Sequence, residues 1–176
     1  MASLVDRMIR ASKLDVNLYE EVEADQGSMG QAITVVIISS IASGIGAIGV
    51  MGLGGVVIGA IAALIGWVVW AFLAYIIGTK LLPEPQTKAD MGEVLRTTGF
   101  ASSPGVLRIL AFIPLIGVLI SIVASIWMLV AMVIAVRQAL DYKSTWRAIF
   151  VCVIGFIIYV VIVGFFLSFF MPSAVI

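Results

Sequence analysis

The sequence predicts an all-α fold, a polytopic bundle of helices that crosses a membrane. All twenty charged residues lie in three short blocks, at 6–25, 80–108 and 137–147. The stretches between and after these blocks, 26–79, 109–136 and 148–176, contain no charged residue. A soluble domain needs charge scattered over its surface, whereas a helix crosses the roughly 30 Å of bilayer hydrocarbon with about 20 apolar residues. The uncharged stretches are therefore expected to be membrane spans.

Composition supports this class and excludes others. Hydrophobic residues make up 62% of the chain, charged residues 11%, and the mean hydropathy is +1.22. Ten basic residues balance ten acidic ones, so we expect no nucleic-acid partner. Histidine is absent, which removes the commonest metal ligand and every Ser-His or Cys-His nucleophile pair. The single Cys152 lies in an apolar run and is expected to be a small packed side chain. We expect no cofactor, no metal and no enzyme activity.

The first segment, residues 1–30, differs from the rest. Its charges are mixed, and it lacks the pattern of a cleavable signal peptide. Apolar residues recur in it at roughly helical spacing: Leu4, Val5, Met8, Ile9, Val16 and Tyr19. This pattern predicts an amphipathic helix that lies on the cytoplasmic membrane surface. Residues 31–176 are then expected to form a single membrane domain.

The first uncharged stretch is long enough for two spans. We expect them at 32–49 and 56–81, with the turn in the glycine-rich segment between them. Pro83 and Pro85 follow the second span and lead into a polar loop.

A short helix is expected inside this loop. Asp90 and Glu93 have the spacing of a capping box, and Gly99 is placed to end the helix. Met91, Val94 and Leu95 share one face, so we expect this helix to lie along the membrane interface.

The following stretch, 106–136, is too long for a single upright span. Ser102 and Ser103 precede Pro104 as helix-start signals, and Pro114 offers a break. We therefore expect a short third segment at 104–113 that turns at Pro114, and a full fourth span at 116–136.

The fifth span is expected at 148–170, begun by Ser144 or Thr145 and ended by Pro172. Five segments place the N-terminus, both charged loops and all ten basic residues on one side. Because cytoplasmic loops are enriched in Lys and Arg, the N-terminus is expected to be cytoplasmic and the C-terminus outside. Four spans would instead put Arg137, Lys143 and Arg147 outside.

Small residues recur at four-residue spacing in the first two spans, which predicts close helix packing, either within the bundle or at a dimer face. The candidate packing residues are Ser40, Gly44, Gly55, Gly59, Ala63 and Gly66. Ser121 and Ser125 form a similar pair in the fourth span. Trp67, Trp70 and Trp127 fall nearer the middle of their spans and either line a pocket or fill the bundle.

Arg108 is the one charged residue expected inside the membrane, within one turn of the interface. It is interpreted either as a ligand of a lipid phosphate or an acidic partner, or as a cytoplasmic anchor. The candidate contacts for a partner or a lipid are Arg96, Arg108, Arg137, Trp146 and Arg147. Their positive charge also suits anionic headgroups.

Several motifs together resemble a known family. They are LYEEVEAD at 18–25, LRTTGFASSP at 95–104, ASIW at 124–127, VRQAL at 136–140 and TWRA at 145–148. In order and spacing the chain resembles the Yip1-domain membrane proteins, of the prokaryotic type with a short N-terminal region, over about residues 15–170. The resemblance implies a five-helix domain with a cytoplasmic N-terminus. It also implies a likeness to eukaryotic adaptors of vesicle trafficking, which contact Rab-type GTPases and oligomerise.

The sequence favours a membrane scaffold, adaptor or accessory subunit that acts through helix packing and its cytoplasmic face. The expected partners are the lipid bilayer, a second copy or another membrane protein, and an anionic lipid. The alternative is a small transporter, channel component or lipid-handling protein, favoured by the interrupted third segment. The expected location is the cytoplasmic membrane of a prokaryote, with a eukaryotic endomembrane as the alternative.

Overall fold

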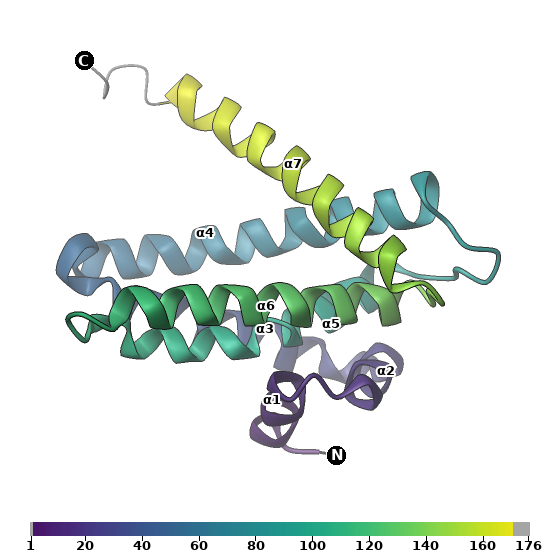
Figure 1. Cartoon of the computed structure of the whole chain (residues 1–176), viewed down its shortest axis with the longest axis horizontal. Coiled ribbons are helices and arrows are strands. Elements are labelled where there is room, and N and C mark those ends of the chain that lie inside the picture. Colours follow the sequence, from purple (N-terminus) through teal and green to yellow (C-terminus); the bar gives the residue numbers. More distant parts are fainter. Residues whose placement is uncertain (1, 171–176) are drawn as a thin grey trace.

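The structure, a computed structural model, describes residues 2–170 and is helical (Figure 1). The described chain contains no strand, so the all-α prediction is confirmed. In chain order the elements are α1 (Leu4–Ser12), α2 (Val16–Ala24), η1 (Gln26–Ser28), α3 (Met29–Gly46), α4 (Ile48–Ile76), η2 (Ile77–Leu81), α5 (Met91–Phe100), η3 (Ser103–Phe112), α6 (Gly117–Ala139) and α7 (Thr145–Phe170). The segments η1 and η3 are 3₁₀ helices, and η2 is a π-helical turn.

Four helical stretches are long and apolar enough to cross a membrane. They are Gln26–Gly46, Gly52–Leu81, Gly117–Ala139 and Thr145–Phe166. The chain is therefore an integral, polytopic membrane protein, as predicted. The helix starts expected at Ser144 or Thr145 agree with α7, whereas Pro172 lies outside the described residues.

The short third segment is built from two pieces, α5 and η3. Both run beside α3 in the same direction: Gly99 lies against Ala32, the Ser39 hydroxyl donates to the Ser102 carbonyl, and Gly46 lies against the backbone of Arg108. At about 1.5 Å per α-helical residue and about 2.0 Å per 3₁₀ residue, the two pieces together rise roughly 35 Å. Neither alone qualifies as a span, so the five-segment count stays a prediction.

The break at Pro114 is confirmed. The 3₁₀ helix ends at Phe112, α6 begins at Gly117, and the residues between form a tight turn. Leu115 occupies this turn with a φ of 72° and is fully exposed.

The prediction that α5 lies along the interface is wrong. Residues 96–105 are all buried, and α5 packs against α2, α3, α4 and α6. Small side chains permit this insertion: a Cβ on Gly99 would lie 2.8 Å from the Cβ of Ala32. The Thr97 and Thr98 hydroxyls donate to carbonyls of their own helix, so they bring no unpaired donor into the core. The predicted capping box is confirmed, with both of its hydrogen bonds at 2.8 Å.

The first turn occupies residues 47–52, so it includes Gly49 and Gly52 of the predicted turn but begins three residues earlier than predicted. The helix α3 ends at Gly46 and α4 begins at Ile48, while Gly52 forms a kink with a φ of 64° and a ψ of 178°. A Cβ on Gly46 would overlap the carbonyl oxygen of Arg108, so only glycine permits this approach of α3 to η3. Packing against η3 therefore sets the turn.

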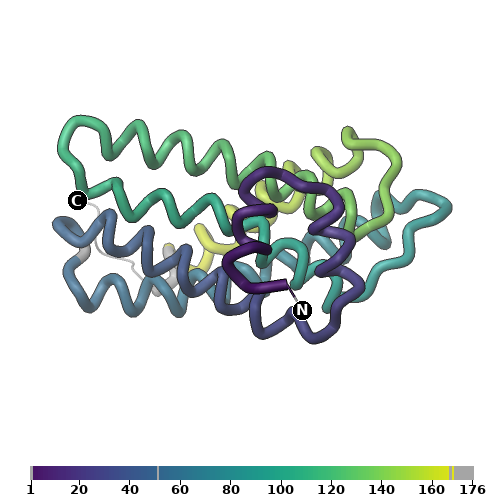
Figure 2. Tube along the Cα trace, turned by 90° about the horizontal axis from the view of Figure 1, so that it is seen from below, coloured from purple at the N-terminus to yellow at the C-terminus, as the bar shows by residue number. Residues whose placement is uncertain are grey.

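The N-terminal segment forms two helices instead of one. The chain breaks at Leu14, which has a φ of 62°, and Asp15 caps the second helix. Figures 1 and 2 show α1 and α2 folded back on the bundle. Leu18, Tyr19 and Val22 are fully buried in one core with Phe100. This segment is therefore packed against the bundle through its own apolar face.

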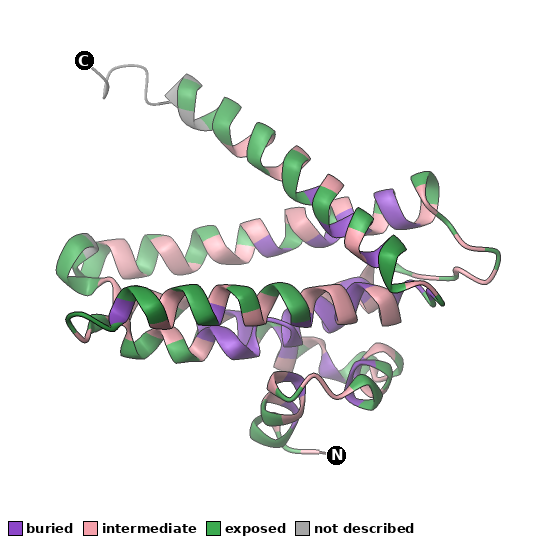
Figure 3. Ribbon diagram, viewed as in Figure 1, coloured by how far each residue is buried: buried purple, intermediate pink, exposed green. Residues whose placement is uncertain are grey.

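Two ends of the molecule differ in character. The polar end comprises α2 and the loops 82–90 and 140–144. The two loops contact each other: the Gln86 amide donates to the Asp141 carbonyl at 3.0 Å, and Glu84 accepts from the Lys143 backbone at 3.0 Å. The helix α1 is joined to α2 and lies beside η3 and the middle of α6. The far end comprises the turns at 47–52 and 113–116. Figure 3 shows burial concentrated toward the polar end, whereas the helices beyond it are largely exposed.

Candidate functional site

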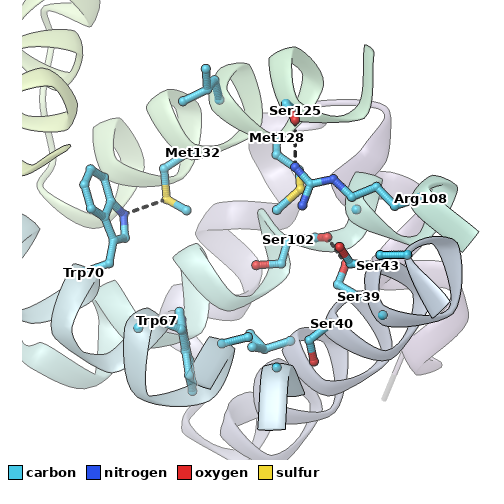
Figure 4. A pocket seen from close by; sticks show the side chains of 18 of the residues that line it. Ser39, Ser40, Ser43, Trp67, Trp70, Ser102, Arg108, Ser125, Met128 and Met132 are labelled. Carbon is cyan, nitrogen blue, oxygen red and sulfur yellow. Dashed lines mark hydrogen bonds between the residues drawn. The ribbon is translucent and has the colours of Figure 1, made fainter. Parts of the chain in front are cut away.

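A hollow of about 630 Å³, which we call the lateral cavity, is lined by residues of α3, α4, η3, α6 and α7 (Figure 4). It keeps the backbones of α4 and α6 apart, and large side chains bridge the two helices toward the polar end. Its volume falls within the roughly 300–1,000 Å³ that is typical of small-molecule sites.

All six candidate packing residues line the lateral cavity: Ser40, Gly44, Gly55, Gly59, Ala63 and Gly66. At Gly44 a Cβ would lie 2.8 Å from Val56, so α3 and α4 do approach closely there. At Gly59, by contrast, a Cβ would meet no atom within 4 Å. The small residues thus permit close contacts at Gly44 and at Gly66, where a Cβ would lie 2.7 Å from the Tyr159 hydroxyl, and leave the space open at Gly59.

Aromatic and thioether side chains close the cavity toward the polar end. Trp67 Nε1 donates to Thr98 Oγ1 at 3.1 Å, and Trp70 Nε1 donates to Met132 Sδ at 3.2 Å (Figure 4). Of the two readings that the sequence left open, the structure places Trp67 and Trp70 on the pocket wall. Trp127 lies elsewhere and donates to the Ser12 carbonyl at 2.8 Å.

Arg108 reaches into the cavity from η3. Its Nη2 donates to Ser125 Oγ at 2.8 Å (Figure 4), and no carboxylate of the described chain forms an ion pair with it. Ser125 is eight residues inside α6, which at 1.5 Å per residue is roughly 12 Å from the far end of that helix. Arg108 therefore lies beside a helix that is long and apolar enough to cross a membrane, and both of its interpretations, as a ligand of a lipid phosphate or an acidic partner and as a cytoplasmic anchor, stay predictions.

A second hollow of about 650 Å³ adjoins the first at the far end. Ser43, Arg108 and Ser125 line both hollows, and Ser121 is added in the second. Arg108 therefore stands at the border of two connected spaces. Sequence reasoning identified Arg108 and the two serines of α6 separately but had no signal that they meet.

Arg96, in contrast, is enclosed. Only 5% of it is exposed, its Nε donates to the Val22 carbonyl at 2.9 Å, and its Nη2 donates to the Glu23 carbonyl. These carbonyls lie in the last turn of α2, where helix carbonyls lack partners within the helix. Arg96 therefore joins α5 to α2 and is not exposed to a partner.

The other three candidate contacts gather where α6 ends and α7 begins. Arg137 Nε donates to the Tyr142 carbonyl at 3.2 Å, and Arg147 pairs with Glu84 at 3.4 Å. Trp146 is 70% exposed. The structure thus brings Arg137, Trp146 and Arg147 together at the polar end and places Arg108 apart from them.

An ion-pair cluster that sequence reasoning missed holds α1 to α2. Arg7, almost fully buried, donates to Glu21 at 3.0 Å, to Asp25 at 2.7 Å and to Gln31 at 3.0 Å. Arg10 pairs with Asp15 and shares Glu21, and its hydrogen bond holds the pKa of the Glu21 carboxyl below its ordinary value. The partners lie too far apart in sequence for any helical spacing to reveal them.

Glu23 is a carboxyl at this end whose pKa is raised well above its ordinary value. Burial raises the pKa of its carboxyl to about 7, and the negative charges of Asp141, Glu93 and Glu20 add to the rise, whereas Arg96 opposes it. No group of three or more Cys, Asp or Glu side chains placed to hold a metal occurs in the described part of the chain.

Comparison with known proteins adds one finding. A family model described as the Yip1 domain matches residues 18–165. Neither the curated proteins nor the solved structures contain a match.

Proposed function

Because this chain belongs to the Yip1-domain family of membrane proteins, we propose that it acts as a non-catalytic membrane scaffold or adaptor. Its polar end binds another membrane protein or a second copy of the chain. The observation that carries this proposal is that the polar end is a folded surface held by specific contacts.

Those contacts fix the surface before any partner arrives. Arg7 fastens α1 to α2, Arg96 fastens α2 to α5, and Glu84 joins the two loops through Lys143 and Arg147. A surface that is ordered in advance loses less conformational entropy when it binds. Such preorganisation suits an adaptor.

The exposed side chains at this end suit a partner. Trp146 is largely exposed, and three exposed cations lie at the same end: Lys88 and Lys143 on the loops and Arg147 in the first turn of α7. Tryptophan and arginine are enriched among the residues that dominate protein interfaces. The cations also suit anionic headgroups of the adjoining leaflet.

We place the polar end in the cytoplasm, with five crossings and the C-terminus on the opposite side, in the cytoplasmic membrane of a prokaryote. Support comes from the basic residues: all ten except Arg108 lie on the elements of the polar end, on α1 and the turn that joins it to α2, or in the parts of η2, α5, α6 and α7 that adjoin this end. Excess Lys and Arg mark the cytoplasmic side.

Site-specific photo-crosslinking in the native membrane tests the adaptor proposal. A photo-reactive residue at Trp146 should yield a discrete crosslinked protein species, whose mass identifies a second copy or a different partner. The same residue at Leu115, fully exposed at the far end, is the matched control. Equal crosslinking at both positions, or lipid adducts alone at Trp146, would refute the adaptor role.

A second candidate function is lipid handling. One observation favours it, the lateral cavity with Arg108 inside the spans.

A further inference from the structure

We propose that the lateral cavity binds one anionic membrane lipid. Arg108 and Ser125 hold its phosphate group, and an acyl chain lies along the small-residue face of α4 toward Trp67 and Trp70. This inference goes beyond the adaptor proposal and does not depend on it.

The first argument is the unmet charge of Arg108. A guanidinium has five N–H donors, and in the described chain Arg108 makes one hydrogen bond, to the neutral Ser125 hydroxyl. Arg7, Arg10 and Arg147 each pair with a carboxylate. A charge at membrane depth is costly unless an opposite charge or water meets it, and a phosphate is a bidentate partner for arginine.

The second argument is the hydroxyl groups around Arg108. Ser43, Ser121 and Ser125 line the hollow at the far end. Ser121 and Ser125 donate to carbonyls one turn back in their own helix, at 3.0 and 2.7 Å. A hydroxyl can rotate to donate elsewhere, so these groups can turn to a phosphate oxygen without movement of the backbone.

The third argument is the apolar space beyond the cation. Gly55, Gly59, Ala63 and Gly66 form one side of the cavity over roughly 16 Å of α4. Open space at Gly59 shows that no side chain of the described protein fills it. Met128 and Met132, whose thioether side chains adapt their shape, line the opposite wall with the tryptophans beyond. A flexible hydrocarbon chain suits such a trough.

The fourth argument is access from the bilayer. The helix α7 contributes only Phe156 and Tyr159 to the cavity. Tyr159 lies against Gly66, and beyond it α7 diverges from α4 and α6 (Figure 1), with Val160 and Val161 exposed. The part of the cavity beside Gly55 and Gly59 is therefore left uncovered by α7 and open to lipid.

A transmembrane helix from a second copy fits the cavity less well. The uncharged stretches of this chain contain no Asp or Glu, so no span of a second copy offers Arg108 a carboxylate. An anionic lipid supplies both the acidic group and the apolar chain in one molecule.

Lipid binding to the purified full-length protein tests the proposal. Delipidated protein in detergent is titrated with dioleoyl-phosphatidylglycerol or with dioleoyl-phosphatidylcholine, and native mass spectrometry counts retained lipids. We expect the protein to retain one phosphatidylglycerol molecule tightly and to bind phosphatidylcholine more weakly. Arg108→Gln should lower the affinity for phosphatidylglycerol at least about tenfold, because a hydrogen bond to a charged group is lost. It should also remove the preference for phosphatidylglycerol over phosphatidylcholine. Lys88→Gln, which removes an exposed cation on a loop, should leave the retention of both lipids unchanged.

A variant that fills the apolar part of the lateral cavity tests lipid binding independently of the Arg108 charge. Gly59→Leu fills the open space of the cavity, and Gly54→Leu makes the same change on the exposed side of the same helix, also with no atom within 4 Å. Gly59→Leu should abolish retention of both lipids, whereas Gly54→Leu should leave retention unchanged.

Three outcomes would overturn the proposal. They are unchanged phosphatidylglycerol retention in Arg108→Gln, equal effects of the two leucine variants, and competition by glycerol 1-phosphate as strong as by the lipid. The last would mean that a soluble anion is the ligand. The lipid-binding assay uses isolated protein, so a negative result would refute the lipid site alone. The adaptor proposal is tested separately, by crosslinking at Trp146.

Discussion

Arg96 and Arg108 lie on the same passage of the chain, one on α5 and the other on η3, yet they have opposite surroundings. Arg96 is enclosed at the polar end, where two carbonyls of α2 accept its hydrogen bonds. Arg108 stands half-buried at the lateral cavity with one serine hydroxyl. At the polar end, groups of the protein itself accept the hydrogen bonds of Arg96. At the cavity, no carboxylate of the described chain pairs with Arg108, so a counter-charge must come from a ligand. This difference separates a structural arginine from a candidate binding residue.

Removing the enclosed arginine should have the largest effect on stability. Arg96→Met leaves two carbonyls without a donor between α2 and α5, and we expect a loss of about 2–4 kcal/mol in the free energy of unfolding. Thermal or denaturant unfolding in detergent, followed by circular dichroism, measures it. Lys88→Met is the control, because Lys88 is exposed on a loop. A variant as stable as this control would contradict the structural role of Arg96.

Substitution of two glycines tests the same difference between the tightly packed surroundings of α5 and the open space of the lateral cavity. Gly99→Ala places a Cβ 2.8 Å from Ala32 and 3.2 Å from Trp67 Cζ2, so we expect a loss of about 1–3 kcal/mol. Gly59→Ala meets open space, so it should be neutral or stabilising by up to about 1 kcal/mol. The same unfolding assay compares them. Equal destabilisation by both substitutions would show that the space beside Gly59 is filled.

The titration of Glu23 gives the polar end a pH dependence. Its carboxyl has a pKa of about 7 in the folded protein, above its ordinary value of 4.5, so the folded state binds more protons between these two values. Stability should therefore fall as pH rises from about 4.5 to about 7. The groups facing Glu23 are Glu20, Glu93, Asp141 and Arg96.

Glu23→Gln removes this titration, so the melting temperature of the variant should vary less with pH across that window than that of the native protein. Melting temperatures measured in matched buffers test this expectation. A pH profile identical to that of the native protein would assign the dependence to other groups.

The smallest effect is expected at the cavity. Arg108→Met removes a half-buried charge that no carboxylate partners, so stability in lipid-free detergent should change by less than about 1 kcal/mol. The variant should instead lose its preference for anionic lipid. A destabilisation as large as that of Arg96→Met would make Arg108 a structural residue like Arg96.

Local signals predicted much of the fold. The capping box of Asp90 and Glu93, the break at Pro114 and the start of α7 all depend on residues within one turn of each other. The glycine-rich turn was predicted, but its start was placed three residues too late, because the backbone contact of Gly46 with Arg108 joins residues from different elements. The burial of α5 was missed for the same reason, since its partners come from four other helices.

The candidate site was predictable only in pieces. All six small residues and Arg108 were identified from spacing and charge, but spacing does not tell whether a small face contacts a neighbour, as Gly44 does, or borders empty space, as Gly59 does. The ion pairs of Arg7 link residues 14 and 18 positions apart, on two helices that turn back at Leu14.

The sequence by itself determined that this is an integral membrane protein, because the transfer of an apolar helix into hydrocarbon depends on the residues of that helix alone. It likewise determined that the charges gather in three short blocks between uncharged stretches. Only the tertiary structure decided which arginine is enclosed and which is left open. That outcome depends on where α2, α6 and α7 lie, because a charge is satisfied by its neighbours in space, wherever they stand in the chain.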